Sequence, residues 1–173
     1  AMDDVIITAA LGTAYTGETG STSTANANQI VHGSAGLTIA KLRTAKQTLD
    51  LGNVDPSIPR HIIVSPKQIT DLLGTTEVTS SDFNTVKAFA NGEVNSFLGF
   101  NFIVSNRLAL SSTTRSCIAC AQDGIALAVG KDVNARIDER SDKSYATQVY
   151  YSMALGATRM EEEKVVQIPC QEA

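Results

Sequence analysis

The chain has 173 residues, which is long enough for one domain with a substantial core, and its 43% apolar and 18% charged residues are typical of a globular protein. Its net charge of -4 gives no electrostatic reason to bind nucleic acid, because binding to phosphates depends on clustered Lys and Arg side chains. No stretch approaches the ~18 consecutive apolar residues of a membrane-spanning helix, and no signal peptide opens the chain. We therefore expect a cytosolic protein that has no membrane partner.

The first 28 residues contain a short apolar run and then a polar stretch. Residues 4–10 are compatible with the end of a helix or with a strand, and residues 12–28 are rich in Gly, Ser, Thr and Asn. This composition predicts an exposed loop. The spacing of Gly12, Gly17 and Gly20 does not indicate a phosphate-binding loop, because no Gly-Lys-Ser or Gly-Lys-Thr sequence follows.

A helix is predicted after Thr38, which is a suitable N-cap residue. Apolar residues then recur at steps of three and four along one helix face, namely Ile39, Leu42, Ala45 and Leu49. Gly52 and Asn53 can end the helix. We expect the polar side chains beside this stripe to face solvent, namely Lys41, Arg43, Lys46 and Gln47.

A strand and a second helix follow as one unit. Residues 61–64 form a short apolar run, which predicts a buried strand. Ser65 is the expected N-cap and Pro66 the first residue of a helix that ends at Gly74. Its apolar face consists of Ile69, Leu72 and Leu73. Residues 75–81 are polar and predict a loop, and a short helical turn is expected within residues 82–90.

The second half of the chain predicts strands. They begin near Phe97 and continue at residues 117–121, 125–129, 135–138, 147–155 and 164–168. In the longest of them, Val149, Tyr151, Met153 and Leu155 alternate with more polar residues, which predicts a half-buried sheet face. The expected fold class is α+β, with helices first and then a mainly antiparallel sheet. Glu161, Glu162 and Glu163 are interpreted as a solvated turn between strands.

The three cysteines are an odd number in a chain without secretory features, so we do not expect a disulfide framework. Cys117 and Cys120 lie three residues apart in a predicted strand, which sends their thiols to opposite faces. Neither these residues nor Cys170 therefore indicates a metal or redox site, and all three are interpreted as small core residues.

The sequence contains no convincing catalytic constellation. His32 and His61 are the only near-neutral acid-base groups, and no known catalytic or nucleotide-binding motif accompanies them. Paired carboxylates such as Asp138 and Glu139 lie in turn-like segments. We expect neither enzymatic activity nor a cofactor. A small hydrolase or ligand-binding domain stays open as an alternative, and a deep pocket that combines His61 with carboxylates would favour it.

The stretch from Leu42 to Leu108 resembles the axial domain of tailed-bacteriophage major capsid proteins. Its helix is followed by Arg60-His-Ile-Ile-Val-Ser-Pro66 and then by the pair Leu72 and Leu73, as in that family. Further matching segments are Thr79-Ser-Ser-Asp82, Asn91-Gly-Glu93, Phe97-Leu-Gly-Phe100 and Ile103-Val-Ser-Asn-Arg-Leu108. The segments 150–156 and 164–168 resemble the closing strands of the family. The order and spacing of these segments carry the resemblance.

The resemblance implies a phage major-capsid-protein fold in three parts. Residues 1–36 correspond to the end of a long spine helix and a Gly-, Ser- and Thr-rich loop, residues 37–135 to the axial domain at the capsomer centre, and residues 136–173 to closing strands shared with the peripheral domain. The chain is thus expected to be a C-terminal fragment that lacks the N-terminal arm and the extended loop. Because those elements clasp neighbours in the family, we expect the fragment to be a monomer or a weak oligomer.

The resemblance also implies the function. Copies of the protein are expected to self-associate into pentameric and hexameric capsomers that enclose double-stranded DNA, in the virion and, during assembly, in the host cytoplasm. Contact with the packaged DNA should be weak and independent of sequence, in agreement with the net negative charge. An encapsulin, which is a protein nanocompartment for cargo enzymes, is the alternative with the same fold.

A polar loop is the candidate for the tip that faces the capsomer axis. Its residues are Thr75, Thr76, Glu77, Val78, Thr79, Ser80 and Ser81. We select this loop because it lacks the run of apolar residues that would anchor it in the core of its own subunit.

Overall fold

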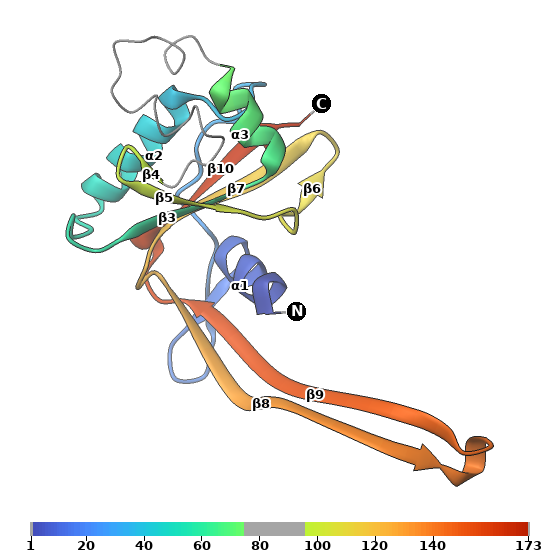
Figure 1. The fold of residues 1–173 in the computed structure, drawn as a ribbon. Coiled ribbons are helices and arrows are strands. Elements are labelled where there is room, and N and C mark those ends of the chain that lie inside the picture. Colours follow the sequence, from blue (N-terminus) through green and yellow to red (C-terminus); the bar gives the residue numbers. More distant parts are fainter. Residues whose placement is uncertain (1, 75–95, 173) are drawn as a thin grey trace.

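The computed structural model describes residues 2–74 and 96–172, and in it the chain has two parts (Figure 1). The first part is a six-stranded sheet that packs against two helices, and we call it the body. The second part is a long two-stranded ribbon that projects away from the body, and we call it the arm. Helix α1 (Met2–Leu11) lies where the arm leaves the body.

The sheet of the body has the strand order β10-β7-β3-β5-β4, and β6 pairs with β7 at one side. Strands β3 and β5 are parallel, and the other pairs are antiparallel. The predicted α+β class with a mainly antiparallel sheet is therefore confirmed. The strands are β3 (Arg60–Val64), β4 (Ser96–Phe97), β5 (Phe100–Val104), β6 (Leu110–Ser111), β7 (Thr114–Ala121) and β10 (Val165–Gln171).

Helix α2 (Ile39–Leu51) forms as its sequence predicts. The Thr38 hydroxyl accepts a hydrogen bond from the Lys41 amide at 3.3 Å, which satisfies one free N–H group of the first turn. The predicted stripe of Ile39, Leu42, Ala45 and Leu49 is buried. The helix ends at Gly52, as expected.

Lys41 corrects one detail of the prediction, because this side chain is buried and does not face solvent. Its ammonium group donates hydrogen bonds to the carbonyl oxygens of Ala35 at 2.7 Å and Pro169 at 2.9 Å. These two acceptors compensate for the loss of water, so the cation connects the segment before α2 to strand β10.

Helix α3 (Pro66–Leu73) begins at Pro66, as the sequence predicts. Leu72 is fully buried. Ser65 lies at the N-cap position as predicted, but its side chain makes no capping hydrogen bond, because its hydroxyl donates to Glu172 at 2.7 Å. The other fully buried residue of the helix is Gln68, whereas Ile69 is only half-buried. The Gln68 amide accepts from the Leu37 N–H at 2.7 Å and donates to the Gln171 carbonyl at 3.2 Å, so its burial leaves no polar group unpaired.

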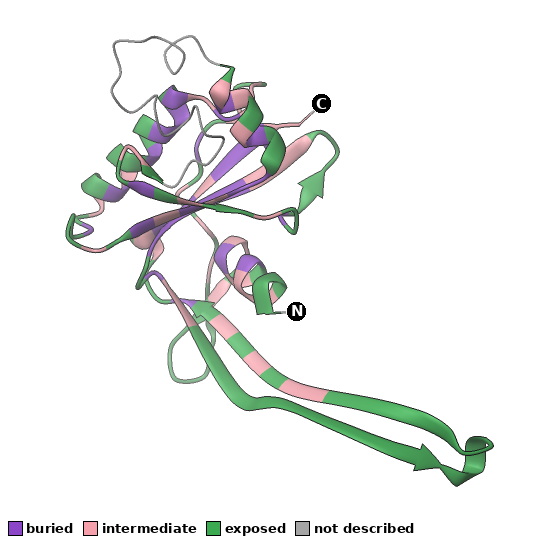
Figure 2. Ribbon diagram, in the orientation of Figure 1, coloured by how far each residue is buried: buried purple, intermediate pink, exposed green. Residues whose placement is uncertain are grey.

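The arm consists of β8 (Ile125–Arg140) and β9 (Ala146–Arg159), which are joined by a short 3-10 turn, η1 (Ser141–Lys143). Two predictions were wrong here. The strands expected at residues 125–129 and 135–138 are one continuous strand, and the half-buried face expected for residues 147–155 is exposed over its distal half (Figure 2). Every residue in the range 127–151 is exposed, and the contacts of the ribbon with α1 lie at its end nearest the body.

The segment between α1 and the body is more ordered than its composition predicts. Within the expected loop, β1 (Ala14–Thr16) and β2 (Thr22–Thr24) form a small antiparallel hairpin, although it is exposed as expected. The acidic turn is η2 (Glu162–Lys164), between β9 and β10. Within residues 2–74 and 96–172, no helix is long and apolar enough to cross a membrane.

Candidate assembly surface

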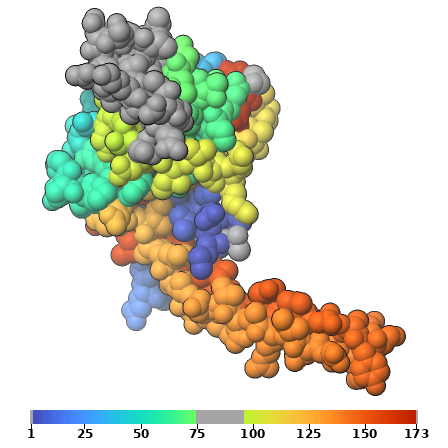
Figure 3. Space-filling model, in the orientation of Figure 1, coloured from blue at the N-terminus to red at the C-terminus, as the bar shows by residue number. Residues whose placement is uncertain are grey.

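The most exposed apolar surface of the described chain lies on the arm, which projects as a narrow extension (Figure 3). Half of the large apolar side chains that are exposed belong to it, namely Leu127, Val129, Val133, Ile137, Tyr145, Val149, Tyr150 and Tyr151. Soluble monomers rarely expose a contiguous apolar patch of this kind without a function in binding. The arm is therefore our candidate assembly surface.

The strand register assigns the side chains of the arm to two faces, because residues paired across an antiparallel ribbon point to the same side. On one face, Ala135 pairs with Tyr151 and Ile137 with Val149. Nearer the body, Val129 pairs with Leu155 on this face, and alternation along β9 adds Met153. We call these seven residues the apolar face. The pairs on the opposite face are polar or mixed, namely Asn134 with Ser152, Arg136 with Tyr150 and Asp138 with Gln148.

Two irregularities in β8 keep the apolar face continuous. The register shifts between Val129 and Lys131 and again between Lys131 and Asn134, so β8 contains two more residues than the matching part of β9. A single extra residue would turn the distal side chains of β8 to the opposite face. The second extra residue restores the alternation, and Ala135 and Ile137 return to the side of Val129. The ribbon bends in this region (Figure 1).

The proximal end of the same side of the ribbon is covered by α1. Ile125 and Leu127 of β8 and Ala157 of β9 contact cavities that α1 also lines. At the end of β9, the buried Arg159 guanidinium donates to the carbonyl oxygens of Ala10 at 3.1 Å and Thr24 at 2.9 Å, and to that of Gly12. It also forms an ion pair with Glu162 at 3.2 Å. Arg159 therefore satisfies free carbonyl groups at the end of α1 and fixes the direction in which the arm leaves the body.

His61 lines an apolar groove of about 380 Å³ between α1, strands β3 and β5, and the base of β8. Asp3 and Cys120 also line this groove, which is the pocket that the hydrolase alternative requires. Among the described residues, however, no hydrogen bond or ion pair joins His61 to either of them. Burial raises the pKa of the Cys120 thiol to about 11, so it is not a nucleophile at neutral pH. His61, Asp3 and Cys120 line the same groove, but they are not joined in the hydrogen-bonded arrangement that a catalytic site needs.

Cys117 lies on the other face of β7, as the sequence predicts. Its thiol contacts that of Cys170 on β10, and this hydrogen bond together with burial raises the pKa of Cys117. All three cysteines are buried core residues. Across residues 2–74 and 96–172, no group of three His, Cys, Asp or Glu side chains is placed to bind a metal ion.

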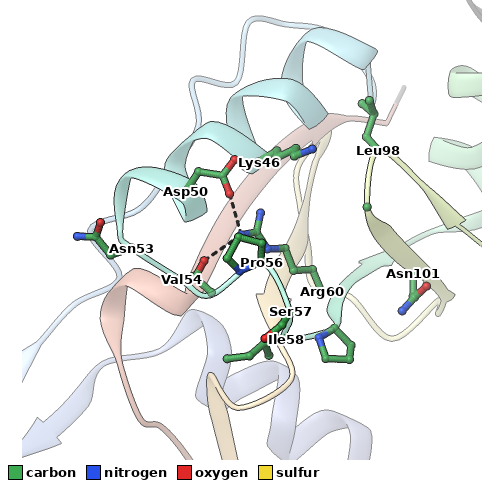
Figure 4. Close-up of a pocket in the computed structure, with 12 residues that line it drawn as sticks. Lys46, Asp50, Asn53, Val54, Pro56, Ser57, Ile58, Arg60, Leu98 and Asn101 are labelled. Carbon is green, nitrogen blue, oxygen red and sulfur yellow. Dashed lines mark hydrogen bonds and ion pairs between the residues drawn. The ribbon is translucent and has the colours of Figure 1, made fainter.

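A second cavity, of about 660 Å³, lies between the end of α2, the loop before β3 and the β4–β5 turn (Figure 4). Its buried Arg60 donates to the Val54 carbonyl at 3.1 Å and pairs with Asp50 at 2.7 Å. These contacts hold the loop against α2, so Arg60 has a structural role. At the acidic turn, Lys164 pairs with Asp123 at 2.6 Å and with Glu161 at 3.0 Å. Glu161 and Glu163 are exposed, as predicted for a solvated turn, but Glu162 is only 21% exposed and pairs with the buried Arg159.

The candidate axis loop, with Thr75, Thr76, Glu77, Val78, Thr79, Ser80 and Ser81, lies outside the described residues, and so does the expected helical turn at residues 82–90.

His32 contacts the Thr114 hydroxyl at 3.1 Å, far from the groove that His61 lines. The structure thus does not bring the two histidines together. Sequence reasoning predicted the β9 half of the apolar face from the alternation at residues 147–155, but it missed the exposure of this face and the residues that β8 adds to it.

Solved structures of phage proteins and of an encapsulin share the fold of the chain. The chain matches a protein of Mycobacterium phage Che8 with a TM-score of 0.68 and 17% identity over 83% of this chain. It matches the capsid of Ralstonia phage GP4 with a TM-score of 0.69 and 12% identity over 99% of this chain. An encapsulin from Synechococcus elongatus gives a TM-score of 0.55 and 10% identity over 84% of this chain. Our chain spans 53%, 63% and 53% of the lengths of these three proteins. The chain therefore shares its fold with the Ralstonia phage GP4 capsid and with the encapsulin.

The family profile described as phage capsid protein matches residues 1–172 of the chain. The chain therefore belongs to the phage capsid protein family, and the resemblance stated from its sequence is confirmed. No curated protein sequence matches it. Because the matching family is structural, the apolar groove at His61 is not interpreted as an active site.

Proposed function

We propose that the chain is part of the major capsid protein of a tailed bacteriophage or prophage, and that copies of this protein form pentameric and hexameric capsomers around double-stranded DNA. The family match over residues 1–172 is the observation that carries this proposal. The division into a well-packed body and an exposed apolar arm supports it, because a subunit of a shell needs a stable unit and surfaces for its neighbours.

The body is proposed to be the axial domain at the capsomer centre. Most of the body comes from residues 37–135. Helix α1 lies in residues 1–36 and strand β9 in residues 136–173, whereas strand β8 of the arm begins before residue 135 and ends after it. Strand β10 returns to the sheet of the body and closes it against β7. Arg107 supports the connection between the parts, because it pairs with Asp4 of α1 at 2.9 Å.

Contact with the packaged DNA is proposed to be weak and independent of sequence. The net charge of -4 is unfavourable for binding phosphates, and several cations are already paired with carboxylates within the chain. Examples are Arg60 with Asp50, Arg107 with Asp4 and Lys164 with Asp123. Filter binding of short DNA duplexes at physiological salt should detect no specific complex, and a salt-resistant specific complex would contradict this part of the proposal.

The loop of residues 75–81 is proposed to face the capsomer axis. Lys in place of both Thr76 and Thr79 would gather like charges around the axis and should block capsomer formation by the complete gene product. The same double substitution should leave this chain folded, which circular dichroism can check. Normal shells from the double variant would contradict the placement of the loop.

The chain by itself is proposed to be a monomer or a weak ring at micromolar concentration. Interfaces below about 1,000 Å² rarely hold in dilute solution, and the matched shell proteins are much longer than this chain. Sedimentation velocity over a concentration series measures this state. A stable oligomer that persists on dilution would contradict the proposal.

An encapsulin-type compartment is the second candidate, and the match to the Synechococcus elongatus protein favours keeping it. Electron microscopy of the complete gene product expressed alone should show closed shells in both cases. The two functions differ in contents and in neighbouring genes, because a phage head holds DNA and its gene lies beside packaging genes. Particles from the native source that contain a protein cargo and no DNA would favour the compartment over the phage head.

A further inference from the structure

We propose that the cavity between the end of α2, the loop before β3 and the β4–β5 turn binds a carboxylate group, and that Lys46 and Arg60 hold it. The cavity has a volume of about 660 Å³, and none of the described residues that line it belongs to the arm (Figure 4). The inference goes beyond the proposed function, because it assigns a ligand to a site that self-association does not require.

The charges around the cavity favour a ligand with one negative charge. Lys46 and Arg60 contribute two positive charges and Asp50 contributes one negative charge. No other charged side chain among the described residues lines the cavity, so one positive charge is left, in a chain whose net charge is -4. A carboxylate would neutralise this charge, whereas a doubly charged phosphate would leave an excess of negative charge beside Asp50.

The ammonium group of Lys46 is available to a ligand. The side chain is exposed, and within residues 2–74 and 96–172 it makes no hydrogen bond or ion pair. In Figure 4 it extends from α2 toward Leu98, and both residues line the cavity. Lys46 therefore presents three unused N–H donors and a full positive charge at the edge of the site.

The guanidinium of Arg60 is fixed in place but only partly paired. Its Nη2 atom donates to the Val54 carbonyl at 3.1 Å and pairs with Asp50 at 2.7 Å. Arg60 is 6% exposed, its Nε atom is buried without a hydrogen-bond partner in the described chain, and Nη1 makes no hydrogen bond to a described residue. Because a buried cation normally satisfies its donors, an acceptor in the cavity would compensate this guanidinium.

The β4–β5 turn adds an apolar and strained rim. The two strands are joined by Leu98 and Gly99 alone, and both have positive φ, at 52° and 84°. Gly adopts this conformation easily, but a bulky side chain such as Leu does so only under strain, and strained residues are concentrated at binding sites. Leu98 lies opposite Pro56 and Ile58 of the loop before β3, and these three side chains suit the aliphatic stem of a carboxylic acid.

Titration of the ¹⁵N-labelled chain with sodium acetate, at an ionic strength held constant with sodium chloride, tests the site by NMR. The Arg60 Nε–H signal should shift and saturate. Lys46→Ala should raise the dissociation constant of acetate by at least about fivefold, because a charge-assisted hydrogen bond is lost. Arg43→Ala is the matched control, since Arg43 is exposed about one turn earlier on α2 and does not line the cavity. This variant should leave the constant within about twofold.

Equal weakening by the two variants would reduce the effect to general attraction by α2 and would overturn the inference. An Arg60 signal that acetate does not move, or tighter binding of inorganic phosphate than of acetate, would also overturn it. Glutamate blocked at both its amino and α-carboxyl groups identifies the source of the carboxylate. Tighter binding than acetate supports an acidic side chain of a protein partner, and weaker binding supports a free small acid. The proposed function does not depend on any of these results.

Discussion

The body and the arm place similar apolar residues in opposite environments. In the body, Ile62 of β3 is fully buried between its sheet neighbours and the helices, whereas Ile137 of β8 is 70% exposed. Both residues belong to paired strands, so strand formation alone does not bury a side chain. Burial needs a second layer, which α2 and α3 provide for the body and which only α1 provides, at one end, for the arm. The difference shows that the described chain supplies a second layer for the body but not for the distal part of the arm.

The largest effect should come from the core of the body. Leu49→Ala and Leu72→Ala each empty a fully buried leucine site, and each should lower the free energy of unfolding by ~2 to 5 kcal/mol. Ile137→Ala on the arm is the control, and it should change the free energy by less than about 0.5 kcal/mol in the isolated chain. Urea denaturation measures all three. Equal effects in the core and on the arm would remove the distinction between the two parts.

The next effect should come from the joint between the parts. Arg159→Ala removes a buried guanidinium that three backbone carbonyls and Glu162 share, and it should cost about 2 to 4 kcal/mol because these acceptors lose their partner. Arg140→Ala, which removes the exposed ion pair with Asp142 at the arm tip, should cost less than about 1 kcal/mol. If thermal unfolding ranks the two variants the other way, Arg159 does not hold the arm in place.

A smaller and pH-dependent effect should come from the end of β10. Desolvation opposes ionisation of Glu172, but the hydrogen bonds from Ser65 and Arg115 outweigh it and lower the pKa of this carboxyl group. A lowered pKa in the folded state means that Glu172 stabilises the body above its ordinary pKa of 4.5, and that this contribution is lost as the pH falls through the lowered value. Glu172→Gln should therefore reduce the loss of stability between about pH 5 and about pH 3. Identical urea midpoints against pH for variant and wild type would exclude this role.

Local sequence signals predicted the elements that depend on neighbours in the chain. Thr38 and Gly52 delimit α2, and Pro66 begins α3, because capping and proline geometry act within one helical turn. The apolar stripe of α2 was also predictable, since it follows from helical periodicity alone. The same holds for the opposite faces of Cys117 and Cys120, which follow from strand alternation.

Features that depend on distant partners could not be predicted in this way. Lys41 can be buried because the Pro169 carbonyl, far along the chain, accepts a hydrogen bond from its ammonium group. Arg159 can be buried because its acceptors include the carbonyl groups of Ala10 and Thr24. The continuity of β8 was obscured by Gly130 and Asp132, which resemble a break in a strand but form part of an irregular ribbon. The exposure of the arm could not be predicted for a different reason. Alternation along a strand predicts which of its faces is apolar, but it does not predict whether another element covers that face.

A cryo-electron microscopy reconstruction of particles formed by the complete gene product would test the central claim most directly. That claim is that the chain is part of a shell subunit whose body is packed by its own helices and whose arm is buried in the assembled shell. The account predicts a closed shell in which the side chains of Ile137, Val149 and Tyr151, which are exposed in the chain alone, are buried. A closed shell in which these side chains face solvent would contradict it.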